Sequence, residues 1–199
     1  QSSNVHVIYN GVSEDFFVLP DLKYNIVVEK SHKKYIVFIG SREMYKNFDF
    51  AVSVLHHLPD FDFYVIGTEL NNREKRMLDN SLPNRWRSFK NVSNSELNKL
   101  YNGAYALLYP SSYEGFGIPL LEAMKAGTPF VALNASSIPE VAGEAGILLN
   151  RLDKDIFIDA ILSIDSKRGQ LLEKGLKQAA KFSWENCYSE TLALYTSLL

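Results

Sequence analysis

The sequence predicts a single α/β domain built on a mostly parallel sheet with helices on both faces. Two observations carry this prediction. Short apolar segments of strand type alternate with amphipathic segments of helical period along most of the chain, an order typical of parallel strands joined by crossover helices. The chain has 199 residues, 46% hydrophobic and 22% charged, which is long enough for one substantial core and rather short for two.

The N-terminal part of the chain supplies the first strands and the first helix. Apolar runs predict strands at Val5–Tyr9 and Tyr35–Ile39, and the stretch 20–32 between them has little periodicity. Apolar residues at helical spacing predict an amphipathic helix over Asn47–Leu58, which Pro59 ends.

The middle of the chain repeats the order of strand and helix. The predicted strands are Phe61–Ile66, Arg85–Phe89 at a sheet edge and Tyr105–Tyr109, and the predicted helices are Arg73–Asn80, Ser93–Tyr101 and Pro119–Ala126. Ser93 has Glu96 three residues later, which is the spacing of a capping box. Gly127 is a typical helix stop.

The last part of the chain changes from strands to helices. The predicted elements are strands Phe130–Leu133 and Gly146–Leu149, a helical turn at Pro139–Val141 between them, and helices Asp155–Ile164, Arg168–Lys181 and Trp184–Leu198. No segment repeats at a fixed period and no low-complexity linker divides the chain. We therefore predict one Rossmann-like domain over residues 1–199 with a C-terminal helical extension.

Composition argues against several classes of function. A net charge of −2 gives no electrostatic case for nucleic acid, which favours a basic face. The single Cys187 cannot build a disulfide framework, and the four histidines lack metal-binding spacing, so we expect no metal and no cofactor. No apolar run reaches the roughly 20 residues of a membrane span and no secretory signal opens the chain. We expect a cytoplasmic location and leave a peripheral membrane contact open.

The most informative stretch is Tyr109–Ala126, which holds Glu114 and Glu122 on either side of a glycine-hinged turn into a helix. Gly115 and Gly117 permit a tight or left-handed backbone, and a proline suits the first position of a helix. The first amides of such a helix lack intrahelical partners, and the helix dipole adds a partial positive charge. The turn therefore predicts a diphosphate site flanked by two carboxylates that accept hydrogen bonds from hydroxyls.

A second constellation follows the strand Tyr35–Ile39, where a turn at Gly40 carries Arg42 and Lys46 before the next helix. In an open parallel sheet the ligand lies at the carboxyl ends of the strands, so both cations should share a rim with Glu114. There they would clamp a diphosphate, arginine as a fork and lysine as a point charge.

Each of these residues also has a plainer interpretation. Glu122 in a first helical turn would complement the helix dipole, and Glu114 would be a solvated loop charge. Arg42 and Lys46 in a surface loop are more often solvated than functional, and short motifs carry a real risk of false positives. On spacing alone the two interpretations of the glutamates are about equal.

A family resemblance favours the functional interpretation. The run from Glu114 to Met124, Glu-Gly-Phe-Gly-Ile-Pro-Leu-Leu-Glu-Ala-Met, resembles the two-glutamate motif of retaining GT-B glycosyltransferases of family four, the glycosyl transferases group 1. The loop from Gly40 to Asn47 resembles the Gly-x-Arg loop of that family, which ends in Lys-Asn. Nearly the whole chain fits the C-terminal, donor-binding domain of these enzymes.

The resemblance implies roles for the matching residues. Arg42 and Lys46, in the loop that Gly40 opens, would contact the donor phosphates, and Glu114 would contact sugar hydroxyls. Glu122 would hold the ribose hydroxyls. The segment Gly115, Phe116, Gly117 and Ile118 would lie along the sugar and phosphate, and Gly67 would lie near the base. The implied reaction is hexosyl transfer from a nucleoside diphosphate sugar to an acceptor hydroxyl with retention and without a metal. GDP-mannose is mildly favoured over a UDP-hexose.

The resemblance also implies a missing half. The phrase Val7–Val12 resembles the crossing from the N-terminal to the C-terminal domain, although many members have proline where Tyr9 stands. We therefore expect an isolated donor-binding domain, with the acceptor glycan or lipid held by an absent N-terminal domain. The helix 184–199 would pack on that domain, or on a second copy as a homodimer, and ordinary packing on this domain is the alternative.

Other functions remain open on the sequence alone. Two carboxylates also serve glycoside hydrolysis, but the phosphate-binding surroundings argue against it. A nucleotide-sugar epimerase on a related fold is a further alternative, and a phosphorylase would need a cofactor lysine motif that is not found. A non-catalytic nucleotide-sugar-binding module is the alternative from a different class.

Overall fold

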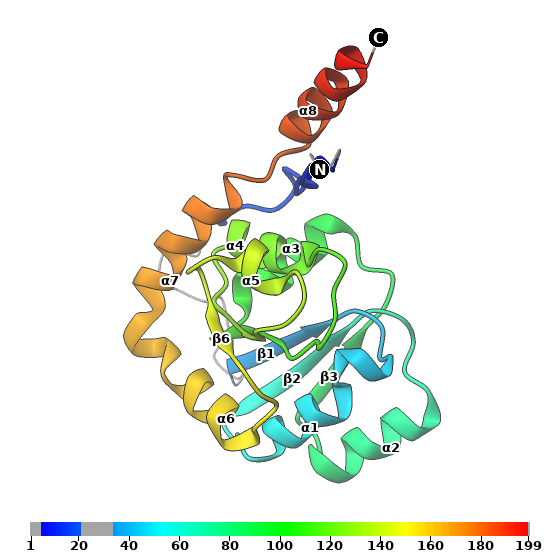
Figure 1. Ribbon diagram of the computed structural model, residues 1–199. Coiled ribbons are helices and arrows are strands. Elements are labelled where there is room, and N and C mark those ends of the chain that lie inside the picture. The colour runs from blue at the N-terminus through cyan, green and yellow to red at the C-terminus, as the bar shows by residue number, and fades with distance from the viewer. Residues whose placement is uncertain (1–4, 21–33, 199) are drawn as a thin grey trace.

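The computed structural model describes residues 5–20 and 34–198, which form one six-stranded parallel sheet with helices on both faces (Figure 1). The sheet order is β3-β2-β1-β4-β5-β6. The strands are β1 (Lys34–Ile39), β2 (Phe61–Ile66), β3 (Trp86–Phe89), β4 (Ala106–Tyr109), β5 (Phe130–Leu133) and β6 (Ile147–Leu149). The predicted Rossmann-like α/β class is confirmed, and β3 lies at a sheet edge as predicted.

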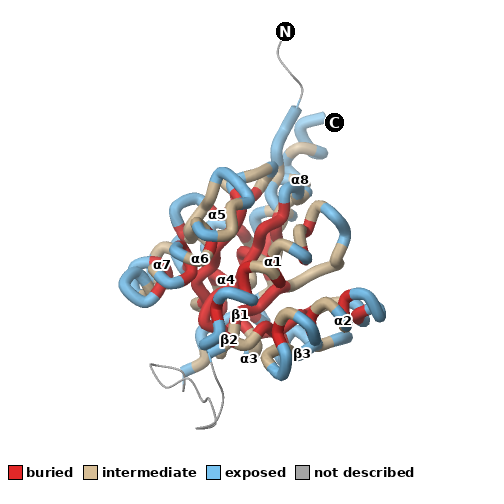
Figure 2. The backbone as a smooth tube through the Cα atoms, turned by 90° about the horizontal axis from the view of Figure 1, so that it is seen from below, coloured by how far each residue is buried: buried red, intermediate tan, exposed pale blue. Residues whose placement is uncertain are grey.

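The central strands are buried on both faces, as their apolar sequences require. In β1, Ile36 and Phe38 contribute to the core on one face and Val37 to the core on the other. Figure 2 shows this burial continuing through the middle of the sheet, with exposed segments around it. The two cores hold the carboxyl ends of the strands in fixed register.

Helices cover the two faces in separate sets. One core contains residues of α1 (Phe48–His56), α2 (Asn72–Ser81) and α6 (Lys154–Leu162). The other contains residues of α3 (Asn94–Gly103), α4 (Ile118–Lys125) and α5 (Ile138–Ala142). Helix α7 (Ile164–Ala179) contributes Leu171 to the first core and Ala179 to the second. The predicted helices are confirmed, with boundaries shifted by a few residues at most.

Local capping explains where several helices begin and end. Helix α3 has the predicted capping box, in which the Ser93 side chain accepts from the Glu96 amide and the Glu96 side chain accepts from the Ser93 amide. Helix α2 has a second box between Asn71 and Glu74. Gly127 follows α4 with a φ of +75°, the left-handed conformation expected after a helix.

The prediction of a strand at Val5–Tyr9 is wrong. The apolar run looks like a strand, but Val5, His6 and Val7 are exposed, and the segment pairs with neither edge of the described sheet, β3 or β6. Further along, the N-terminal segment packs on α3 instead, where the amides of Phe17 and Leu19 donate to the side chains of Asn98 and Asn102. Apart from Pro20, the aperiodic stretch 20–32 lies outside the described residues.

The last helix, α8 (Trp184–Ser197), stands away from the sheet beside the N-terminal segment (Figure 1). None of its residues is buried, so contact with the described part of this domain covers little of the helix, and what α8 packs on stays a prediction. A Cβ on Gly11 would lie 2.1 Å from the backbone nitrogen of Trp184, so a glycine lets the two segments meet. No helix in the described part of the chain is long and apolar enough to cross a membrane.

Candidate functional site

The predicted site residues gather where the sheet order reverses. From β1 the chain continues to β2 and β3 on one side, and β4 pairs with the other side of β1. Ligands of open parallel sheets bind at such a switch point, outside the carboxyl ends of the strands. The loops that follow β1 and β4 are joined there, because the Ser112 amide donates to Tyr45 O at 2.8 Å and Asn47 Nδ2 donates to Pro110 O at 2.8 Å.

Lys46 and Glu114 form an ion pair across this point. Lys46 Nζ lies 2.6 Å from Glu114 Oε1, and the two side chains are only 10% and 11% exposed. The interpretation of both residues as solvated loop charges therefore does not hold. Removing two charges from water is costly unless they are paired, so each residue depends on the other. The pair leaves the remaining Lys46 protons and the second Glu114 oxygen for further partners.

Arg42 reaches the same rim but is directed to the loop after β2. Its Nη2 donates to Thr68 Oγ1 at 2.7 Å and to Glu69 O at 2.8 Å. Its Nε lies 3.2 Å from Glu74 Oε2, an ion-pair distance without hydrogen-bond geometry, and the Arg42 side chain is 5% exposed. The structure thus brings Lys46 to Glu114 but holds Arg42 against Glu74.

Two glycines let the ends of β1 and β2 approach each other. Gly40 and Gly67 have φ values of +121° and +149°, which side chains rarely adopt. A Cβ on Gly67 would lie 2.4 Å from Gly40 O, so no side chain fits there. The two predicted glycines therefore shape the rim through their backbone.

The turn between the two glutamates is open at the start of α4. Gly117 is the N-cap with a φ of +105°, and no side chain caps the helix. A Cβ on Gly115 would meet no atom within 4 Å, so the backbone there faces open space. Ile118 is the first residue of the helix and Pro119 is the second. The arrangement leaves the positive end of the α4 dipole free for an anion.

Two serines that the sequence reasoning missed hold this turn from β5. The hydroxyls of Ser136 and Ser137 donate to Glu114 O at 2.7 and 2.9 Å, and Ser137 Oγ also lies 2.9 Å from Phe116 O. The signal was available, because polar residues that follow a parallel strand lie on the same rim as those that follow its neighbours.

Glu122 lies on α4 below the turn. Tyr101 of α3 donates a hydrogen bond to Glu122 Oε2 at 3.0 Å. Burial raises the pKa of Glu122, and the hydrogen bond from Tyr101 opposes that rise. Glu122 is therefore a half-buried carboxylate held by a specific donor, and not simply an exposed charge that complements the helix dipole.

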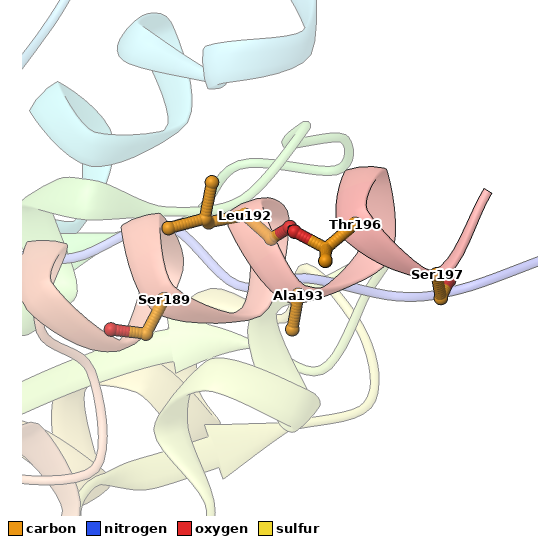
Figure 3. Close-up of a pocket in the computed structure, with 5 residues that line it drawn as sticks. All are labelled: Ser189, Leu192, Ala193, Thr196 and Ser197. Atoms are coloured by element: carbon orange, nitrogen blue, oxygen red, sulfur yellow. The ribbon is translucent and has the colours of Figure 1, made fainter. Parts of the chain in front are cut away.

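A separate pocket of about 520 Å³ lies on α8 (Figure 3). It is lined by Ser189, Leu192, Ala193, Thr196 and Ser197. These side chains supply neither a charge nor a general base, so we place no chemistry there. Within residues 5–20 and 34–198, no three His, Cys, Asp or Glu side chains are grouped as metal ligands. Independence from metal stays a prediction.

A family model described as glycosyl transferases group 1 matches residues 23–182. The chain belongs to this family. The matched range contains both the loop after β1 and the two-glutamate turn, so the motif resemblance and the family assignment rest on the same residues.

Two curated relatives are mannosyltransferases by name. The chain is 44% identical over 110 residues to the O-antigen chain mannosyltransferase B of Escherichia coli, which covers 54% of this chain and 29% of that protein. It is 29% identical over 168 residues to the O-antigen chain mannosyltransferase RfbU of Salmonella typhimurium, which covers 82% of this chain and 45% of that protein. The chain therefore spans less than half the length of either relative.

Solved structures show the same fold. HepE of Anabaena, in complex with UDP and glucose, matches with a TM-score of 0.84 at 17% identity over 96% of this chain and 57% of that one. A sucrose-phosphate synthase of Thermosynechococcus elongatus matches with a TM-score of 0.81 at 20% identity, over 97% and 52%. The chain therefore has the fold of one half of a GT-B glycosyltransferase.

Proposed function

We propose that this chain binds a nucleoside diphosphate hexose and supplies the donor-binding half of a retaining hexosyltransferase. The observation that carries the proposal is the buried Lys46–Glu114 pair beside the uncapped start of α4, at the switch point of the sheet. This arrangement offers cationic and amide donors to a diphosphate and a carboxylate to sugar hydroxyls. GDP-mannose is the favoured donor, because the two relatives are named mannosyltransferases.

The proposed chemistry is mainly a matter of charge. When the anomeric bond breaks, negative charge builds on the β-phosphate of the leaving nucleotide. The Lys46 ammonium and the first amides of α4 are already fixed, so they stabilise that charge without reorganising. Arg42 contributes once part of its guanidinium turns from Thr68 and Glu69 toward the phosphates. These groups make a metal unnecessary in this proposal.

The two glutamates then have different tasks. Glu114 positions the hexose by accepting from its hydroxyls, and Lys46 and the two serines fix its side chain and backbone. Glu122 accepts from the ribose hydroxyls, with Tyr101 orienting its other oxygen. In this account Glu114 acts by position and charge and forms no covalent bond to the sugar.

We further propose how the acceptor is held and what helix α8 packs on. An acceptor glycan or lipid would be held by a second domain, as the partial coverage of the relatives suggests. Helix α8, which exposes Trp184, Tyr188 and Leu192, would pack on that domain or on a second copy of this chain. The cytoplasmic location and the peripheral membrane contact stay predictions.

Calorimetric titration of this chain with GDP, UDP, GDP-mannose and UDP-glucose tests the proposal. We expect one nucleotide to bind, with affinity reduced about tenfold by Glu122→Ala, because a hydrogen bond to a charged group is lost. Glu144→Ala is the matched control, since Glu144 pairs with Lys174 on the surface away from the switch point. Added chelator should leave binding unchanged. Failure of every nucleotide to bind the folded chain at millimolar concentration would contradict the proposal.

A further inference from the structure

Tyr109, the last residue of β4, carries a buried hydroxyl without a partner. The residue is 1% exposed, and its Oη makes no hydrogen bond with any described residue. Two other buried tyrosines are satisfied: Tyr101 donates to Glu122, and Tyr105 donates to Ile161 O at 3.3 Å. A buried polar group without a partner costs free energy, so this hydroxyl needs an explanation.

The surroundings of the hydroxyl are those of the site. Lys46 Nζ lies 5.4 Å from the centre of the Tyr109 ring. Burial raises the pKa of Tyr109, and the Glu114 carboxylate raises it further, both by its charge and because it is close enough to interact with the hydroxyl, although the two make no well-formed hydrogen bond; the charge of Glu122 adds a smaller rise. The group is therefore a neutral O–H donor beside both glutamates.

The donor substrate changes the balance at Glu114. Without a ligand, the Lys46 ammonium neutralises the Glu114 carboxylate at 2.6 Å. A diphosphate arriving at the start of α4 competes for that ammonium, and the carboxylate loses part of its partner. A neutral hydroxyl nearby can then donate to the carboxylate without adding charge, so Glu114 keeps a partner and its orientation.

We propose that Tyr109 is a positioning residue for the donor sugar, whose hydroxyl donates to the Glu114 carboxylate when the donor diphosphate engages Lys46. The inference rests on the proposed function of the site. It gives a reason for an unsatisfied hydroxyl in the ligand-free protein, because the partner becomes available only in the bound state. Tyr109 acts through Glu114 and, at 1% exposure, does not contact the substrate itself.

Tyr109→Phe tests this, because it removes only the hydroxyl. Tyr105→Phe is the matched control, since Tyr105 directly precedes the same strand, is 2% exposed and has a satisfied hydroxyl. The urea midpoint of unfolding is measured for both variants and the wild type. In a separate experiment, each folded protein is titrated with GDP-mannose, GDP, UDP-glucose and UDP.

We expect the two variants to change the urea midpoint in opposite directions, and only Tyr109→Phe to weaken binding of the sugar nucleotide. Tyr109→Phe should keep or raise the urea midpoint of the ligand-free chain, because an unpaired buried hydroxyl is gone, and should weaken the sugar nucleotide about tenfold. The free nucleoside diphosphate also engages Lys46 and should be weakened, but less than the sugar nucleotide, because only the sugar nucleotide uses the oriented Glu114 carboxylate to hold the hexose. Tyr105→Phe should lower the midpoint and leave both affinities unchanged.

The results separate a failure of the Tyr109 inference from a failure of the proposed donor binding. If Tyr109→Phe binds the sugar nucleotide as tightly as the wild type, or loses the sugar nucleotide and the free diphosphate equally, this inference is overturned and donor binding stands. A fall in both midpoint and affinity would assign the hydroxyl a structural role and also overturn it. If the wild type binds none of the four ligands, the proposed function fails and the inference with it.

Discussion

At the residue scale, the site contains buried or half-buried charges that need a hydrogen-bond or ion-pair partner to be stable. Lys46 and Glu114 are nearly buried and satisfy each other, whereas Glu122 is half-buried with only a neutral tyrosine as donor. The difference follows from where each side chain lies: the loops after β1 and β4 meet, but α4 places Glu122 under the turn. These two arrangements make different predictions for stability.

Glu122 should make stability depend on pH. Its pKa is raised by burial, so the folded state favours the protonated carboxyl. Glu122 therefore contributes stability at low pH that is lost as the pH rises through its raised folded value. Glu122→Gln should be more stable than the wild type at about pH 8, with the difference shrinking toward about pH 4. Urea unfolding across this range measures it, and a difference that does not vary with pH would refute this reading of Glu122.

The Lys46–Glu114 pair should show strong coupling. Lys46→Met or Glu114→Gln alone leaves a buried charge unpaired and should cost about 3 kcal/mol of unfolding free energy. The double variant removes both charges and should recover about 2 kcal/mol of the summed loss. The exposed pair Lys177–Glu173 is the control and should show no coupling outside error. Additive losses at positions 46 and 114 would show that the two charges do not depend on each other.

At the element scale, the rim is set by backbone geometry at the strand ends. Gly40 and Gly67 bring the ends of β1 and β2 together, and Gly117 turns the chain into α4. Ser136 and Ser137, from the loop after β5, fix the carbonyls of the turn. The ends of β1, β2, β4 and β5 therefore shape one rim, and a change in any of the loops that follow these strands should alter the site.

Gly67→Ala should damage the rim. The added Cβ would lie 2.4 Å from Gly40 O at a φ of +149°, so the unfolding free energy should fall by about 2 kcal/mol or more. The matched control is Gly169→Ala in α7, where a Cβ meets no atom within 4 Å. That exposed helical change should stabilise the chain by about 0.5–1 kcal/mol. Equal effects of the two substitutions in thermal unfolding would contradict the close approach of β1 and β2.

At the scale of the whole molecule, the sequence predicted which segments form strands and helices better than it predicted what each segment pairs with or packs against. Strands such as β2 and β4 were identified because continuous apolar runs between turn residues carry the signal for buried parallel strands. The strand prediction at Val5–Tyr9 was wrong because a short apolar run does not show whether the segment will pair with another strand. The rim shared by Lys46 and Glu114 followed from parallel topology.

Contacts set by tertiary packing lay beyond the sequence. Nothing in the loop sequence indicates that Arg42 turns to Glu74, or that Tyr109 is left without a hydrogen-bond partner, because both depend on distant elements. The unburied face of α8 is similar, since the sequence predicted the helix but its packing partner stays a prediction.

The most direct test of the central claim is an NMR titration of the isotopically labelled chain with GDP-mannose, following the backbone amides. We expect the largest shifts in the loops after β1 and β4, at Gly40, Gly115 and Gly117, with α8 unaffected. Shifts confined to the α8 pocket around Leu192, or no shifts in any amide with GDP-mannose or with UDP-glucose, would contradict a donor site at the switch point of the sheet.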